Sequence, residues 1–213
     1  MTKLYIVRHG NAISNEKLVY AGHSDYDLTE IGLKQAQTLK TFFKDKKVDK
    51  VYSSDLIRAY KTVKVVADMF DLEVITSQNL RELYGGDWED MKFEDIAKNY
   101  PKEFSVWRNE MHKLQIPNGE SIVNLAKRVS FEIRKIAEEN DGKTVVIGSH
   151  GGSIRSFIAT ELSNFTNTPI SLLGWVPNCS ITTVEYENGQ FKCIEIGNDE
   201  HVGSLSTNLP KEV

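Results

Sequence analysis

Short apolar runs alternate with amphipathic segments along most of the chain. The runs rich in β-branched residues predict strands at 3–7, 48–54, 73–76 and 143–150. Apolar residues at helical spacing predict helices that begin at Thr29, and others over 55–70, 121–140 and 152–163. Strands that alternate with helices favour a three-layer α/β/α sandwich around a mainly parallel central sheet.

Two hydroxyl side chains stand where helices are expected to begin. Thr29 precedes Glu30, whose charge suits the positive end of a helix dipole, and we expect Thr29 to cap this helix. Ser54 is the corresponding predicted cap for the helix over 55–70. Residues 11–27 are polar and predict a loop.

The C-terminal part departs from the alternation of strands and helices. Residues 180–186 and 191–196 alternate in polarity around Glu187-Asn188-Gly189, which predicts a hairpin and an antiparallel edge of the sheet. We expect the tail over 198–213 to be loosely packed. The chain contains no linker-like segment, so a single domain over 1–213 is expected.

Residues 77–119 mix short helical patterns with Pro101 and Pro117. We expect this stretch to be an excursion from the core that covers part of the site. Its aromatic residues predict a small satellite core, with a substrate-lining wall as the alternative; they include Tyr84, Trp88, Phe104 and Trp107. Trp175 is expected in the main core or at its edge.

The amino-acid composition of the chain argues against several classes of function. The 213 residues are 40% hydrophobic and 26% charged, with a net charge of −4, which argues against a nucleic-acid binder. A local basic pocket for a small anion remains compatible with that charge. Cys179 and Cys193 match no metal-ligand spacing. No apolar run suits a signal peptide or a membrane span, so a cytoplasmic protein without membrane contact is expected.

Candidate chemistry gathers at the ends of the predicted strands, where open α/β sheets bind ligands. In strand order, the residues found there are Arg8 with His9, then Arg58, then Glu82, and then His150 with Gly151 and Gly152. Each residue alone is compatible with ordinary surface charge. Their agreement at one edge favours a shared site.

Two arginines and two histidines would suit a phosphate dianion. Guanidinium forks match phosphate oxygens and stay charged, so they would take the place of a metal ion. A histidine with one unprotonated nitrogen can act as a nucleophile, and a carboxyl group can protonate the leaving oxygen. A zinc site at His9 and His150 is less favoured, because Arg8 and Arg58 would repel a cation.

An ordered set of motifs resembles the histidine phosphatase superfamily, also called phosphoglycerate-mutase-like. The resemblance runs from Leu4 to about Glu195. The matching segments are LYIVRHGNAISN at 4–15, DLTEIGLKQAQ at 27–37, YSSDLIRAYKT at 52–62, LRELYGGDWE at 80–89, NGES at 118–121 and VVIGSHGGSIR at 145–155.

The resemblance implies a role for each matching residue. His9 resembles the nucleophile that becomes phosphorylated, and Glu82 resembles the general acid that also activates water as a base. The residues that resemble the phosphate pocket are Arg8, Arg58 and His150, with Asn15 as a further ligand and Gly151 as a backbone donor. Gly22 falls on a loop that contacts substrate in the mutases.

Some positions depart from the family pattern. Asn11 and Ala12 stand where many members have Glu or Gln followed by Thr, and Asp27 stands where many have Pro. Mutases usually have a longer basic insertion, and Asn where this chain has Gly152. The acidic segment after Glu82 resembles the phosphatase branch instead.

The resemblance therefore implies a metal-independent phosphomonoesterase that uses no cofactor and acts on a small phosphorylated metabolite. A phosphoglycerate mutase and a weakly active phosphate-binding module stay open as alternatives. A homodimer is compatible with the family, whose members occur as monomers, dimers and tetramers.

Overall fold

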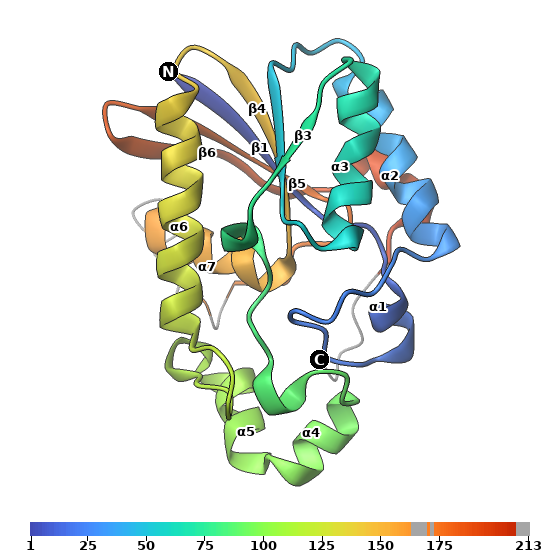
Figure 1. Cartoon of the computed structure of the whole chain (residues 1–213), viewed down its shortest axis with the longest axis vertical. Helices are drawn as coiled ribbons and strands as arrows, with labels where there is room; N and C mark the ends of the chain where they lie inside the picture. Colours follow the sequence, from blue (N-terminus) through green and yellow to red (C-terminus); the bar gives the residue numbers. More distant parts are fainter. Residues whose placement is uncertain (163–169, 171–172, 208–213) are drawn as a thin grey trace.

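The computed structural model describes residues 1–162, 170 and 173–207. One six-stranded sheet has the order β3-β2-β4-β1-β5-β6. The strands β1, β2, β3 and β4 run parallel, and β5 and β6 form an antiparallel hairpin at one edge. In Figure 1, α2 and α3 lie on one side of the sheet and α6 and α7 on the other. The predicted three-layer α/β/α sandwich with an antiparallel edge is confirmed.

The sheet and its flanking helices follow the predicted order along the chain. The strands are β1 (Thr2–Arg8), β2 (Lys50–Ser53), β3 (Val74–Thr76), β4 (Thr144–Ser149), β5 (Ile181–Glu187) and β6 (Gln190–Asn198). The α-helices are α1 (Ile13–Lys17), α2 (Glu30–Phe43), α3 (Ile57–Met69), α4 (Phe93–Asn99), α5 (Pro101–Asn109), α6 (Ile122–Glu139) and α7 (Gly151–Glu161). The 3-10 helices are η1 (Gln78–Leu80), η2 (Gly86–Trp88), η3 (Met111–Lys113) and η5 (Glu200–Leu205).

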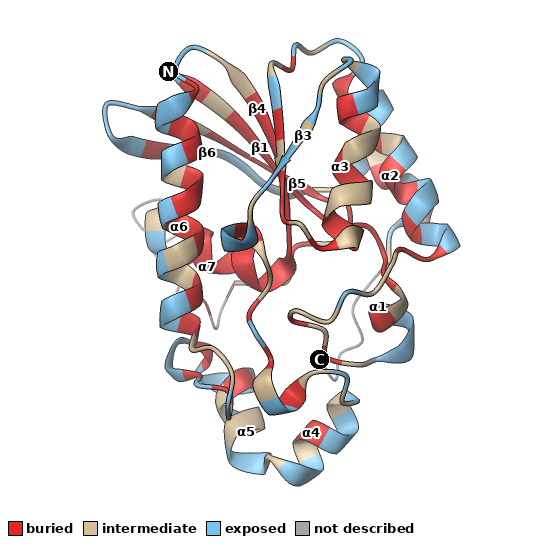
Figure 2. Cartoon of the chain, viewed as in Figure 1, coloured by how far each residue is buried: buried red, intermediate tan, exposed pale blue. Residues whose placement is uncertain are grey.

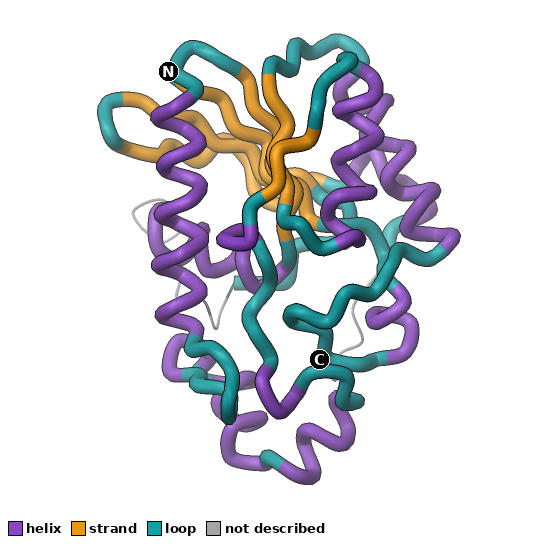
Figure 3. Tube along the Cα trace, in the orientation of Figure 1, coloured by secondary structure: helices purple, strands orange, loops and turns teal. Residues whose placement is uncertain are grey.

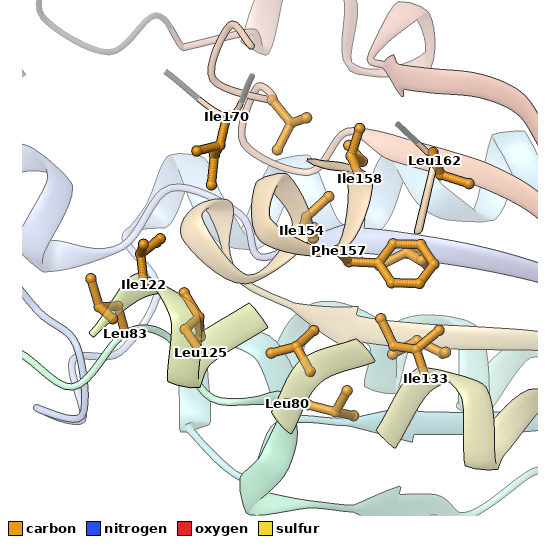
Figure 4. Close-up of a cluster of buried hydrophobic side chains, with 14 of the residues drawn as sticks. Leu80, Leu83, Ile122, Leu125, Ile133, Ile154, Phe157, Ile158, Leu162 and Ile170 are labelled. Carbon is orange, nitrogen blue, oxygen red and sulfur yellow. The ribbon is translucent and has the colours of Figure 1, made fainter. Parts of the chain in front are cut away.

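Alternating side chains of the central strands feed two apolar cores. Leu4 and Ile6 of β1 pack with α6 and α7, whereas Tyr5 and Val7 pack with α2 and α3. Figure 2 shows the central strands buried almost throughout. The first core contains Leu80, Leu125 and Phe157, which Figure 4 shows in close-up. Burial on both faces fixes the register of β1 and β4 and thus the place where each strand ends.

Two local features differ from the sequence expectations. The loop over 11–27 contains the short helix α1, in which the Asn15 side chain accepts a hydrogen bond from the Ala12 amide at 2.9 Å. Helix α3 begins at Ile57 with Leu56 as its N-cap, not at Asp55 with a Ser54 cap. Its first amide donates instead to the Asp25 carboxylate, at 2.7 Å. The cap at Thr29 is confirmed, since its side chain accepts from the Gly32 amide.

The tail after Gly197 is more ordered than expected as far as the structure describes it. Helix η5 packs against α2, with Val202 buried. The Gln35 amide of α2 donates to the Leu205 carbonyl at 2.8 Å. The physical reason is that two apolar side chains, Val202 and Leu205, pack in the core beside α2 while Gln35 bonds the backbone of the same segment. Residues 208–213 lie outside the described part.

Residues 77–119 leave the sheet and return to it at α6. Helices α4 and α5 lie beyond the end of the sheet where β1 and β4 stop, and the loops between them and the sheet converge there (Figure 3). Trp88 and Trp107 pack on each other with ring centroids 5.9 Å apart, and Tyr20 packs on both. The predicted satellite core is present in this form, and it joins the core beneath α6. Within the described residues, no helix combines the length and apolar character needed to cross a membrane.

Candidate active site

The register between β1 and β4 brings the two histidines together. Arg8 pairs with Ser149, and the next amide, that of His9, donates to the Ser149 carbonyl at 3.0 Å. The rings of His9 and His150 therefore lie side by side, with centroids 5.2 Å apart and planes inclined by 59°. That separation is close to the spacing of neighbouring strands, so the pairing of the backbone sets the pairing of the rings.

His9 is held as a neutral ring with one defined tautomer. Its Nδ1 lies 2.7 Å from the Gly10 carbonyl oxygen. A carbonyl can only accept, so Nδ1 carries the proton and Nε2 has a free lone pair. Burial, and then the charges of Arg58 and Arg8, hold the pKa of His9 well below 6.5. The ring is thus unprotonated at Nε2 near neutral pH, as a nucleophile must be.

His150 closes β4 and is the N-cap of α7. It is fully buried, and neither ring nitrogen has a hydrogen-bond partner among the described residues. Burial, and then Arg58 and His9, hold its pKa well below 6.5. Buried polar atoms without partners are costly, so a ligand that accepts and offers hydrogen bonds suits this position.

Arg8 and Arg58 bring two buried guanidinium groups to the histidines. Arg8 donates from Nη1 to the Val176 carbonyl at 2.6 Å, while its buried Nε has no partner in the described chain. Burial lowers the pKa of Arg8 to about 10, so it stays charged at neutral pH. Two buried positive charges beside two neutral rings, with Glu82 as the negative charge that acts most strongly on both, make a site for an anion.

Arg58 is anchored by a loop that crosses in front of α3. Its guanidinium donates to the carbonyl oxygens of Ala21, Gly22 and Ser24, at 3.0, 2.9 and 2.9 Å. Three of its five N–H donors are used by these bonds, and two remain free of bonds within the described residues. The side chain is therefore fixed in direction and still able to bind an oxyanion.

Glu82 follows η1 and lies against the start of α7. Its carboxylate accepts hydrogen bonds from the amides of Gly152 and Ser153, at 2.8 and 3.1 Å, and from the amide of Leu83 at 2.9 Å. A Cβ at Gly152 would lie 2.5 Å from Glu82 Oε1, so only glycine admits this approach. The structure thus joins Glu82 directly to the helix that begins at His150.

The three residues predicted to bind substrate lie at the same site in different ways. Asn15 lines the cleft. Gly151 is the first residue of α7, and a Cβ there would lie 3.0 Å from the Trp175 ring. Gly22 is buried and is not among the residues that line the cleft; it is tied to the site because its carbonyl accepts a hydrogen bond from Arg58.

A cleft with about 630 Å³ of empty volume opens from these residues. Arg8, His9, Arg58 and Glu82 line its inner end. Its outer wall is mostly apolar and includes Leu18, Val19, Tyr20, Phe93, Trp107 and Trp175. Trp107 thus serves both the satellite core and the wall. Trp88 is buried away from the cleft, and Tyr84 is exposed beside His23.

Sequence reasoning missed two contributors to this cleft. Trp175 was expected in the main core or at its edge, and it packs against the core as a partly buried residue. It also lines the cleft, a role that was not predicted, with the guanidinium of Arg155 stacked 4.3 Å from its ring centroid. Glu89 had no predicted role, yet its carboxylate accepts from the amides of His23, Ser24 and Gly85 at 2.8–3.0 Å. It thereby ties the loop that holds Arg58 to the segment after Glu82. The Trp-Glu pair in LRELYGGDWE was the available signal.

No group of three or more His, Cys, Asp or Glu side chains within the described residues has the arrangement of a metal site. Residues that could hold an anion are the ones gathered here. The arrangement can bind a phosphoryl group between Arg8 and Arg58, present His9 Nε2 to its phosphorus, and place a carboxyl group beside it.

Comparison with known proteins agrees with this geometry. The family model of the histidine phosphatase superfamily (branch 1) matches residues 4–199. Phosphoserine phosphatase 1 of Hydrogenobacter thermophilus is 29% identical over the full length of both chains. The probable phosphoglycerate mutase GpmB of Yersinia pestis is 31% identical, over 88% of this chain and 86% of its own.

The fold is shared with solved structures as well. Bacillus stearothermophilus YhfR superposes with a TM-score of 0.87 at 26% identity, over 95% of this chain and 100% of the other. The relatives carry both phosphatase and mutase names, so the comparisons give the class of enzyme and not the reaction. By motif, fold and site, the chain belongs to the histidine phosphatase superfamily.

Proposed function

We propose that the protein is a phosphomonoesterase that works through a phosphohistidine on His9. The observation that carries this proposal is the neutral His9 ring, which has Nδ1 bonded to Gly10 and lines the same cleft as the buried Arg8 and Arg58. Such a ring combines a free lone pair with the charge that a phosphoryl group requires. Arg8, Arg58 and His150 bind the phosphoryl oxygens, with Asn15 and the Gly151 amide as further ligands.

The first half-reaction transfers the phosphoryl group to the enzyme. A bond forms between His9 Nε2 and phosphorus while the bond between phosphorus and the ester oxygen breaks. Glu82 gives a proton to that oxygen, and an alcohol leaves. The arginines neutralise charge on the three equatorial oxygens during the transfer.

The second half-reaction returns the enzyme to its starting state. A water molecule gives a proton to Glu82 and its oxygen bonds to phosphorus, while the bond from phosphorus to Nε2 breaks. Inorganic phosphate leaves, and His9 and Glu82 regain their first protonation states. No cofactor takes part in either step.

The lining of the cleft favours a phosphatase over a mutase. Within the described part of the lining, Arg8 and Arg58 are the positively charged residues, and both lie at the phosphoryl end. A phosphoglycerate would place a second acidic group against Phe93, Trp107 or Trp175, with loss of its hydration. A leaving group that is uncharged and partly apolar fits this wall better.

The test is a trapping experiment with a labelled phosphomonoester. The wild type should yield an acid-labile, base-stable phosphoenzyme and release phosphate, in excess chelator as well as without it. His9→Ala should do neither, and His112→Ala, a change of an exposed side chain on η3, is the matched control. Equal rates for His9→Ala and wild type would overturn the proposal. So would conversion of 3-phosphoglycerate to 2-phosphoglycerate with negligible phosphate release.

A further inference from the structure

One arginine of α6 contacts the backbone on either side of Glu82. Arg128 donates from Nη1 to the carbonyl oxygens of Asn79 and Arg81, at 3.0 and 2.7 Å, and from Nη2 to that of Glu82, at 2.7 Å. These three carbonyls belong to the segment that leads from the sheet into the catalytic carboxylate. A single planar group thus fixes the path of that segment.

The carboxylate of Glu120 uses the remaining donors of Arg128. Arg128 Nε lies 2.7 Å from Glu120 Oε1, and Nη2 lies 2.8 Å from Oε2, a bidentate pair. With these bonds all five N–H donors of the guanidinium are satisfied. Glu120 Oε2 also accepts from the Tyr84 amide at 3.2 Å, and the Glu120 amide donates to the Tyr84 carbonyl at 2.9 Å.

The pair therefore holds the chain before and after Glu82. Leu80 and Leu83 of the same segment are buried in the core beneath α6 (Figure 4). These apolar anchors and the hydrogen bonds from Arg128 together leave residues 81 and 82 little freedom. With the backbone held in this way, the Glu82 carboxylate accepts hydrogen bonds from the amides of Gly152 and Ser153.

The position of this ion pair is unusual for a stabilising contact. The side chains of Arg128 and Glu120 are only 19% and 15% exposed. A largely buried pair contributes little net stability, because the loss of hydration offsets the attraction. The pair is therefore better explained as a device that holds the backbone of residues 79–84 in place than as a source of stability.

We propose that Arg128 and Glu120 are positioning residues for the proton transfer by Glu82. Neither reaches the reacting atoms; both act through the backbone of residues 79–84. Glu120 belongs to the NGES motif at 118–121, to which the proposed mechanism gives no other task. The inference rests on the proposed role of Glu82 as general acid.

Leaving-group dependence separates this role from plain support of the fold. A nitrophenolate departs without protonation, whereas an alkoxide needs a proton from the enzyme. Arg128→Lys keeps the charge but cannot make the five-bond fork. We expect Arg128→Lys to lower kcat/KM for an alkyl phosphate on the order of 10-fold more than for p-nitrophenyl phosphate. Glu120→Gln should show the same bias and supplies the test if Arg128→Lys folds poorly.

Arg134→Lys is the matched control on the same helix. Arg134 also pairs with a carboxylate, that of Glu161, and donates to a backbone carbonyl, that of Gly189 at 2.8 Å. It lies away from the site, so any change should be equal for both substrates. Thermal unfolding of each variant reports the purely structural part.

The Glu82→Gln background completes the experiment. Glu82→Gln alone should show the strongest bias against the alkyl phosphate, and adding Arg128→Lys to it should add no further bias. If Glu82→Gln shows no bias, the proposed acid is wrong and the positioning role falls with it. If Glu82→Gln shows the bias but Arg128→Lys and Glu120→Gln slow both substrates equally, the positioning role alone is overturned.

Discussion

The rings of His9 and His150 lie 5.2 Å apart because the two residues end neighbouring parallel strands in register. Neither ring depends on a flexible loop for its place. Arg58 and Glu82 lie in the same cleft as His9, one held by carbonyl oxygens and the other by amides. The site is thus built around two residues whose spacing is a property of the sheet.

The two buried histidines should make stability depend on pH. Folding holds the pKa of both rings well below 6.5, whereas in the unfolded chain they titrate near 6.5. Below pH 6.5 the unfolded chain therefore binds more protons, and the free energy of unfolding falls as pH falls. Each histidine contributes a slope of at most about 1.4 kcal/mol per pH unit.

Urea denaturation between pH 7.5 and 5 measures this slope. His150→Gln removes one of the two groups and should flatten it by up to one proton, while the carboxylates contribute equally to both proteins. An unchanged slope in His150→Gln would show that His150 is not held neutral by the fold.

Arg58→Lys should weaken phosphate binding and slow the reaction. A lysine cannot bond three carbonyl oxygens and still offer two donors to an anion. We expect kcat/KM to fall roughly 10²- to 10³-fold and the inhibition constant of inorganic phosphate to rise. Lys64→Ala, an exposed change on the same helix, is the control and should leave both values unaltered. Wild-type phosphate inhibition in Arg58→Lys would contradict the assignment.

Gly22→Ala should act on the site through Arg58. A Cβ at Gly22 would lie 2.1 Å from the Leu83 carbonyl oxygen and 2.5 Å from Glu89 Oε1, so the loop has to move. We expect a loss of about 1–3 kcal/mol in the free energy of unfolding, together with a rise in KM. Gly174→Ala meets no atom of the described residues within 4 Å and provides the matched comparison. KM and the free energy of unfolding should be measured for both variants, and only Gly22→Ala should change both.

Trp175→Ala should change substrate preference more than stability. The ring lines the cleft and is only partly buried, so its loss removes a contact surface for the leaving group. KM for an aryl phosphate should rise roughly 10-fold, while KM for methyl phosphate stays the same. Trp88→Phe alters a buried ring away from the cleft and should lower stability without changing the ratio of the two KM values. A ratio unaffected by Trp175→Ala would remove this wall from substrate recognition.

The strands, and the candidate site residues that follow each of them, could be predicted because both depend on short-range sequence patterns. Apolar β-rich runs that stop at Arg8-His9 and at His150-Gly151 identify the strand ends, and parallel strands end at one edge. That rule suffices to bring His9, Arg58, Glu82 and His150 together. Thr29 was visible as a cap for the same local reason.

The features that the sequence did not predict share a different physical cause. Trp175 lines the cleft because Arg155 and Gly151 meet its ring, and these contacts join residues distant from its own local pattern. The start of α3 depends on Asp25, a partner 32 residues away. Helix η5 docks on α2 through Gln35, which no local periodicity reveals. Long-range polar partners decide all three, and a hydrophobic pattern does not encode them.

The sheet places the two histidines, whereas residues 77–119 supply part of the cleft wall, and this separation has an evolutionary consequence. Substitutions at Phe93 or Trp107 can reshape what the cleft admits while the backbone pairing of β1 with β4 stays intact. Homologues can therefore differ in the substrates that their clefts admit while the two histidines keep their positions. One ancestral sheet suffices for a lineage of enzymes with unlike substrates.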